Sequence, residues 1–181
     1  MLTNNCKKLM SQYLMKNWYS TATYINGLIN TNNATVNLDQ SASTNLTTLA
    51  NAFNSITTDN SMSALSSSGA ISCLALGSGT TEATTSDYKL ESIISNTNLV
   101  VSSATVGATT NGKQYSVVVS NATNEDITVS EIGLFLKINL SAIGMGGIVA
   151  GAYMLARDVL ETPVILTPGQ VGTFTFEINF I

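Results

Sequence analysis

Alternating apolar and polar residues mark the clearest strands of this chain. In residues 126–136, DITVSEIGLFL, apolar and polar side chains alternate as far as Ser130, and residues 132–136 are almost continuously apolar. Alternation is the period of a half-buried strand, whereas a continuous apolar run is typical of a strand inside the core. The pattern therefore predicts a strand that passes from a sheet edge into the core.

The C-terminal residues repeat the alternating pattern. Between Gly172 and Phe180, phenylalanines and an isoleucine alternate with Thr, Glu and Asn, so we expect one face of aromatic core and one wet face. Residues 167–170 carry Pro and Gly at the middle positions that a type II turn prefers. These residues predict a tight turn followed by the last strand.

Shorter apolar runs predict the remaining strands, at residues 71–76, 99–106, 114–120, 153–160 and 163–166. The second and third runs are joined through residues 109–112, where Asn-Gly is the strongest short hairpin signal. Several short strands with turn chemistry between them predict an all-β fold. We expect an antiparallel β-sandwich of the jelly-roll or immunoglobulin-like kind, with an N-terminal helical or extended arm.

The N-terminal segment shows a different period. In residues 5–18 apolar side chains fall at three- and four-residue spacings with lysines between them, which predicts a short amphipathic helix. Its apolar side packs either on the body of the same chain or on a neighbouring subunit, and burial at about 1.5–3 kcal/mol per side chain is enough for either. The segment lacks the pattern of a secretory signal, so we expect it in the mature protein.

Residues 20–69 have weak periodicity and are rich in Thr, Asn, Ser and Ala. Within them, residues 44–56 place apolar side chains at helical spacing and predict a second short helix. We expect the rest to be an extended arm or long loops that gain order mainly on other chains. The sequence thus predicts an N-terminal arm with short helices and assembly contacts at 1–69, and a β-sandwich domain at 70–181.

Residues 138–156 contain no charged residue. Their number approaches the roughly 20 residues that span a bilayer, and two glycines four positions apart have the spacing of a membrane-helix contact. However, Asn139, Ser141 and the glycines lower the hydrophobicity, and a spanning helix would interrupt two strand patterns. We therefore expect residues 138–152 to be a small-residue loop or extended hairpin tip that contacts other subunits.

Composition and charge narrow the possible functions. Only 10% of the residues are charged and the net charge is −4, so the chain lacks the Lys/Arg cluster that binding to nucleic-acid phosphates requires. The absence of histidine excludes Cys/His zinc sites and His-based catalytic triads. There is also no nucleophile elbow and no convincing pair of acids. We predict no catalytic residue, no cofactor-binding residue and no metal ligand.

Cys6 and Cys73 are the only cysteines in the chain. A single pair is not a disulfide framework, so we expect two separate reduced thiols. A Cys6–Cys73 disulfide is the alternative.

Two charged residues fall inside predicted core strands. Glu131 lies in the 126–136 strand, and Arg157, the only arginine, lies in the 153–160 strand. An unpaired buried charge costs several kcal/mol, so each residue needs a partner or water. Glu131 and Glu91 are both candidate partners of Arg157. We expect Glu131, because consecutive strands are usually neighbours in a sheet.

Three stretches carry motifs that recur in the same order in one group of proteins: GSGTTEATTSDYKLES, VSNATNEDITVSEIGLFL and MLARDVLETPVILTPGQVGTFTFEI. They resemble a group of bacteriophage structural proteins with Gly-x-Gly-Thr-Thr, Asp-Tyr-x-Leu-Glu, Glu-Ile-Gly-Leu and Arg-x-Val-Leu-x-x-Pro-Val motifs. The matching positions are Gly77, Gly79, Thr80, Thr81, Asp87, Tyr88, Leu90, Glu91, residues 131–134, Arg157, Val159, Leu160, Pro163 and Val164. The resemblance covers residues 70–181, whereas residues 20–69 are unmatched and residues 138–152 depart from the short hairpin expected there.

The resemblance implies a non-enzymatic virion protein, a subunit of the head, neck or tail. Its partners would be other virion proteins, such as capsid, portal, neck or tail subunits, and copies of itself in a symmetric assembly formed in the host cytoplasm. Neither nucleic acid nor membrane is an expected partner.

Two other hypotheses remain. A carbohydrate-binding or adhesin-like β-sandwich module on a cell or virion surface is one, because Tyr13, Trp18, Tyr19 and Tyr24 cluster near the start of the chain. An enzyme is the other, although the residues offer nothing for acid–base catalysis.

Overall fold

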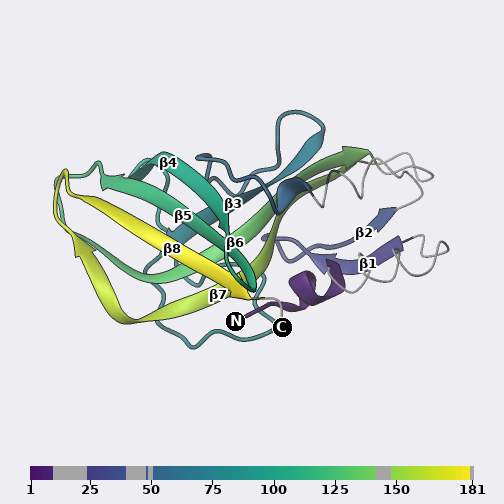
Figure 1. The fold of residues 1–181 in the computed structure, drawn as a ribbon, viewed down its shortest axis with the longest axis horizontal. Helices are drawn as coiled ribbons and strands as arrows, with labels where there is room; N and C mark the ends of the chain where they lie inside the picture. The colour runs from purple at the N-terminus through teal and green to yellow at the C-terminus, as the bar shows by residue number, and fades with distance from the viewer. Residues whose placement is uncertain (10–23, 40–47, 49–50, 142–147, 180–181) are drawn as a thin grey trace.

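The computed structural model describes residues 1–9, 24–39, 48, 51–141 and 148–179. Within them, six strands form two antiparallel three-stranded sheets, and a separate hairpin joins β1 (Tyr24–Ile29) to β2 (Thr35–Asp39). One sheet has the order β3 (Gly69–Gly77), β6 (Ile127–Ser141), β7 (Ile148–Leu166). The other has the order β4 (Leu99–Ala108), β5 (Gly112–Asn121), β8 (Val171–Asn179) (Figure 1). The prediction of an all-β antiparallel sandwich is confirmed.

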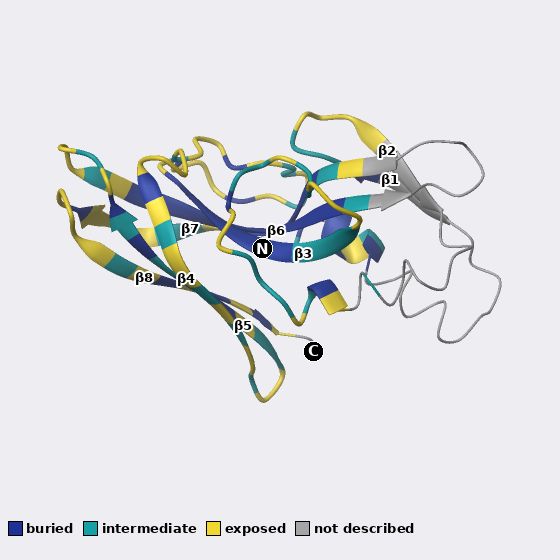
Figure 2. Cartoon of the chain, turned by 90° about the horizontal axis from the view of Figure 1, so that it is seen from above, coloured by how far each residue is buried: buried dark blue, intermediate teal, exposed yellow. Residues whose placement is uncertain are grey.

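The β4–β5–β8 sheet has one buried and one solvated face. Along β5 and β8, the buried side chains are Tyr115, Val117, Val119, Phe174, Phe176 and Ile178. These side chains join one hydrophobic cluster with residues of the other sheet, including Leu134 and Leu155. The residues between them on β8 are exposed or half-buried (Figure 2), so the period-two pattern of the last strand is realised as predicted.

The central part of the β3–β6–β7 sheet is buried on both faces. Its inner face packs in the sandwich core. Its outer face carries a second cluster built around Cys73, Phe135 and Met154, which is covered by the connecting segments that contribute Met62 and Leu90. Burial on two faces explains the continuous apolar run of residues 132–136, because neither side of the strand meets water.

The first residues of the chain extend the edge of this sheet. Leu2 forms an antiparallel bridge with Ala156, and the Thr3 N–H donates to the Leu155 carbonyl. Residues 4–9 are helical, and Cys6 and Leu9 belong to the main core cluster. For this part of the predicted 5–18 helix, the structure decides in favour of packing on the same chain; residues 10–18 lie outside the described part.

The expectation of an extended arm or long loops is wrong for residues 24–39, which form the β1–β2 hairpin. Its turn is closed by Asn30, whose side-chain oxygen accepts from the N–H groups of Asn32 and Ala34, while Asn33 has a φ of 61°. Asn supports such turns through its side-chain oxygen and its tolerance of positive φ. Leu28 and Ala52 are buried in the chain's own core cluster, so these two residues pack on their own chain, while contacts of the segment with other chains stay a prediction.

The second predicted helix, at residues 44–56, is only partly described. Residues 48, 51 and 52 are helical, residues 53 and 54 form a turn, and Ile56 forms an isolated bridge with Ser72 of β3. The rest of the segment lies outside the described residues or has no helical structure.

Residues 138–141 and 148–152 belong to the paired strands β6 and β7, which agrees with the extended hairpin of the two predicted alternatives. Residues 142–147 lie outside the described part, and contacts with other subunits stay a prediction. The register runs through Ile138 opposite Gly151 to Ser141 opposite Ile148. Ladder hydrogen bonds satisfy the backbone of small residues without needing large side chains, which is why Gly151 is tolerated in β7. Among the described residues, no helix has the length and apolarity needed to cross a membrane.

At the opposite end of the sandwich, the buried Asn121 ties the β5–β6 and β7–β8 connections together. Its side-chain amide donates to the carbonyls of Glu125 and Leu166, and its backbone carbonyl accepts from the Gly169 N–H. Gly169 has a φ of 74°, the conformation that the third position of a type II turn requires. The predicted Pro-Gly turn is confirmed.

Candidate functional site: a buried ion-pair network beneath the 78–92 loop

Glu131 is a carboxylate with no solvent exposure. It lies near the start of β6, opposite Gly77, the last residue of β3. Its two oxygens accept from the backbone N–H groups of Gly79 at 3.1 Å, Glu91 at 3.1 Å and Ser92 at 2.8 Å. These donors come from the two ends of the loop formed by residues 78–92, so one carboxylate fixes both ends of that loop.

Arg157 supplies the charge that Glu131 needs. Its Nε donates to Glu131 Oε2 at 2.7 Å, one terminal nitrogen donates to Asp87 at 2.9 Å, and the other donates to the Thr81 carbonyl at 3.0 Å. The expected Arg157–Glu131 pair is confirmed. Glu91, the other candidate partner, lies farther away at 3.7 Å and is partly exposed. Burial opposes the charge on Arg157, but the hydrogen bonds to Asp87 and Glu131 outweigh it and raise the pKa of the guanidinium.

Two acidic side chains hold the middle of the 78–92 loop. Asp87 accepts from the Thr84 N–H and hydroxyl, and Glu91 accepts from the Thr81 N–H and hydroxyl. Burial alone would raise the pKa of Asp87, yet the hydrogen bonds from Thr84 and Arg157 prevail and hold it below its ordinary value. The loop is therefore fastened to itself and to Arg157 by ionised groups.

Three glycines make room for this packing. A Cβ on Gly77 would lie 2.6 Å from the Ser92 carbonyl oxygen, and a Cβ on Gly79 would lie 2.6 Å from the Glu131 carboxylate. A Cβ on Gly133 would meet the Phe135 ring at 2.8 Å and Leu90 at 2.9 Å. Real Cβ atoms do not approach neighbours this closely, so these positions need glycine because of space.

The motif residues from three distant stretches therefore meet at one place. Gly77, Gly79, Thr81, Asp87, Leu90, Glu91, Glu131, Gly133 and Arg157 all belong to the network or to its immediate packing. Pro163 and Val164 do not, because they are exposed on the last part of β7. The structure thus gives most of the motif a single shared role, which is to hold the 78–92 loop on the sheet.

A second ion pair, in which only the lysine is buried, was not predicted from the sequence. Lys137 has no exposed side-chain surface, and its Nζ contacts Asp59 Oδ2 at 2.5 Å and the Ser61 hydroxyl at 3.1 Å. Lys137 lies an even number of positions from Glu131 on β6, so both charges project from the outer face. A lysine inside an apolar strand was the available signal, but its partner is 78 residues away.

The Glu131–Arg157 network can hold neighbouring segments in place, because all its polar groups are engaged in hydrogen bonds. The carboxylate is enclosed by four N–H donors, and each nitrogen of the guanidinium donates to an acceptor. A carboxylate held in this way has no open side from which to act on a substrate. Among the described residues, no group of three or more His, Cys, Asp or Glu side chains could hold a metal ion.

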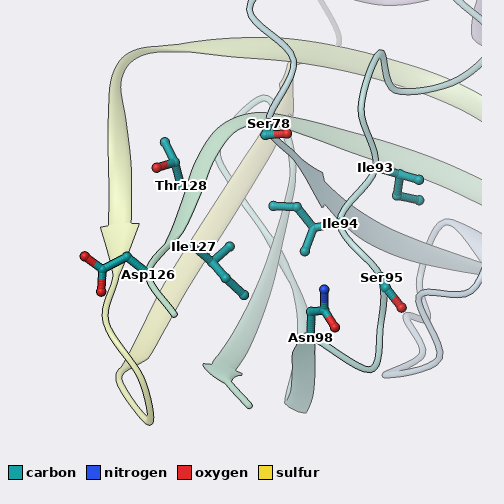
Figure 3. Close-up of a pocket in the computed structure, with 8 residues that line it drawn as sticks. All are labelled: Ser78, Ile93, Ile94, Ser95, Asn98, Asp126, Ile127 and Thr128. Atoms are coloured by element: carbon teal, nitrogen blue, oxygen red, sulfur yellow. The ribbon is translucent and has the colours of Figure 1, made fainter. Parts of the chain in front are cut away.

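An open depression of about 450 Å³ lies beside the network, between the residues after β3 and the start of β6. Ile94 and Ile127 point toward each other across it, whereas the Asp126 carboxylate points away (Figure 3). Its polar lining comes from hydroxyl and amide side chains such as Ser95 and Asn98. These groups can form hydrogen bonds but supply no acid, base or activated nucleophile.

Neither Cys6 nor Cys73 forms a disulfide and both are buried, so the expectation of two separate thiols is confirmed. Burial raises the pKa of Cys6 to about 11 and that of Cys73 to about 12. Of the aromatic residues proposed as a sugar platform, Tyr13, Trp18 and Tyr19 lie outside the described residues.

Comparison with known proteins adds no family to this picture: no family model, curated protein or solved structure matches the chain.

Proposed function

We propose that this chain is a non-enzymatic structural subunit of a bacteriophage virion, located in the head, neck or tail and assembled with other virion proteins. The observation that carries the proposal is the convergence of the motif residues on the Glu131–Arg157 pair. The motifs recur in order in phage structural proteins. Here their residues form one connected hydrogen-bond network that holds the 78–92 loop on the sheet. A resemblance made of mutually dependent residues is a stronger sign of a shared fold than scattered identities are.

The surface chemistry supports the same proposal. Only 10% of the residues are charged, and the ion pairs of Lys137 with Asp59 and of Arg157 with Asp87 fasten connecting segments to the β3–β6–β7 sheet. Ser and Thr occupy much of the outer face of the β4–β5–β8 sheet, where the Ser116 and Thr175 hydroxyls lie 3.1 Å apart. A neutral, hydrogen-bonding surface on a firmly tied sandwich suits a subunit that remains packed among other proteins.

The proposal is tested by the composition of virions. In particles of a phage whose genome encodes this chain, purified by density gradient, quantitative mass spectrometry should find the chain at a fixed copy number relative to the major capsid protein. A chain absent from purified particles would contradict the proposal.

Incorporation can also be tested with variants in a gene-deleted phage complemented from a plasmid. Gly107→Ala should enter particles as the unaltered chain does, because a Cβ there meets no atom within 4 Å. Arg157→Met should enter poorly, because it loosens the 78–92 loop. Binding of the purified chain to a glycan array, together with absence from particles, would favour the carbohydrate-binding hypothesis.

A further inference from the structure

Most sheet edges of the sandwich are covered or interrupted within the described part of the chain. The first residues cover part of the β7 edge through the Leu2 bridge, and bridges from Ile56 and Ile93 cover the β3 edge. Beyond Arg157, β7 undergoes a register shift and contains Pro163, which has no N–H to donate. The edge strand β4 is also interrupted, by a register shift after Val101.

Among the residues that the structure describes, no bridge, bulge or proline protects the free edge of β8. This strand pairs with β5 alone, in unbroken register from Gly112 opposite Asn179 to Ser120 opposite Val171. The strand has no proline, no lysine and one charged residue, Glu177. Natural sheets protect exposed edges with prolines, lysines, bulges or covering segments, because a bare edge presents unpaired N–H and C=O groups to another strand. A nine-residue edge without such devices is equipped for pairing.

We propose that β8 is a dimerisation edge, which pairs antiparallel with β8 of a second copy of this chain about a two-fold axis at Thr175. The pairing joins the two β4–β5–β8 sheets into one sheet of twice the width. Thr175 is the midpoint of residues 171–179, so this register pairs all nine residues of the strand.

The strand's own pattern favours a second copy as the occupant. About this axis, Glu177 lies opposite Thr173 of the other copy, so no like charges meet. On the buried face, Phe174 lies opposite Phe176 of the other copy, and such cross-strand aromatic pairs are stabilising. An axis between two residues would instead place the apolar face of one copy beside the polar face of the other, which the period of a strand disfavours.

The proposal depends on the geometry of β8 and not on the proposed virion function. Dimerisation is measured on the isolated chain, whereas virion function is measured on particles, so either can fail without the other. The matched position for a control is Ser116 of β5. It lies opposite Thr175 on the same outer face, but on the central strand of the sheet.

Sedimentation velocity of the full chain over a range of concentrations tests whether the chain dimerises through the edge of β8. The unaltered chain and Ser116→Lys should dimerise, while Thr175→Lys should weaken the dimer by roughly tenfold or more, because two lysines then face each other across the axis. Both substitutions remove the contact between the same two hydroxyl groups. A difference between the dimer dissociation constants of the two variants therefore reports the effect of a lysine at the β8 edge. A chain that stays monomeric, or a dimer that Thr175→Lys leaves intact, would overturn the proposal.

Cysteine cross-linking tests the register without depending on the lysine variant. Thr175→Cys should form a covalent dimer on mild oxidation, because facing residues on paired strands bring their Cβ atoms to about 4.5–5.5 Å. Ser116→Cys should remain uncross-linked, and the buried Cys6 and Cys73 give little background. Equal cross-linking of both variants would count against pairing through β8.

Discussion

Arg157 lies opposite Gly133 in the β6–β7 register, yet its Nε donates to Glu131, whose register partner is Val159. The guanidinium therefore crosses diagonally to the neighbouring strand, and the position directly opposite carries no side chain. A Cβ at Gly133 would clash with Phe135 and Leu90. The pair and the glycine act together, because the ion pair fixes the register while the glycine lets the strands and the 78–92 loop pack closely.

Removing the guanidinium should leave a buried carboxylate without a cation. We expect Arg157→Met to lower the free energy of unfolding by on the order of 3–5 kcal/mol, since Glu131 keeps three N–H donors but loses its only charged partner among the described residues. Urea denaturation measures this, with Lys113→Met as the control expected to change stability by less than about 0.5 kcal/mol. An unchanged midpoint for Arg157→Met would show that the charge on Glu131 is solvated.

Adding one methyl group at Gly77 should disturb the same region through volume alone. The new Cβ would lie 2.6 Å from a backbone carbonyl, which cannot rotate away as a flexible side chain can. We expect Gly77→Ala to cost about 1–3 kcal/mol. Gly107→Ala, on β4 with open space around it, should be neutral or stabilising by up to about 1 kcal/mol. Equal effects at the two positions would rule out the close contact at Gly77.

The two members of the second ion pair should respond unequally to substitution. Asp59 is 53% exposed, whereas Lys137 is fully buried. Lys137→Met leaves a carboxylate that water can solvate, so we expect a change within about 1 kcal/mol. Asp59→Asn leaves a buried ammonium without a counter-charge and should cost on the order of 3 kcal/mol. The two free energies of unfolding are compared by denaturant titration, and a larger loss for Lys137→Met would contradict the assigned burial.

Acid should destabilise the protein through Asp87. Its pKa is lowered in the folded chain from an ordinary value of 3.8, so its ionised form stabilises the fold above that pH, and this contribution is lost as the pH falls through the folded-state pKa. Unfolding free energies measured from pH 6 downward should therefore decline below about pH 4, and Asp87→Asn should decline less steeply. Asp126→Asn, an exposed position outside the network, serves as the control. Identical slopes for Asp87→Asn and the unaltered chain would exclude this linkage.

The sequence predicted the strands well, because the pattern that marks a strand or a turn involves only neighbouring residues. The alternation of residues 172–180, the Asn-Gly turn between β4 and β5 and the Pro-Gly turn before β8 are all encoded within a few positions. The pairing of Arg157 with Glu131 was also predictable, because consecutive strands are usually neighbours and a buried charge needs an opposite one.

Long-range placement was decided by the tertiary structure. The sequence could not choose between two covers for the first helix, because burial stabilises it equally on its own chain or on a neighbour; only the ladder beside Ala156 settles this for residues 1–9. Likewise, the sequence by itself determined that Lys137 follows the apolar run of residues 132–136, but Asp59 became its partner only when the fold brought residues 78 positions apart together. The alternation of a strand depends on adjacent residues and can be read from the sequence. The partner of a buried charge depends on which residues the folded chain brings next to it.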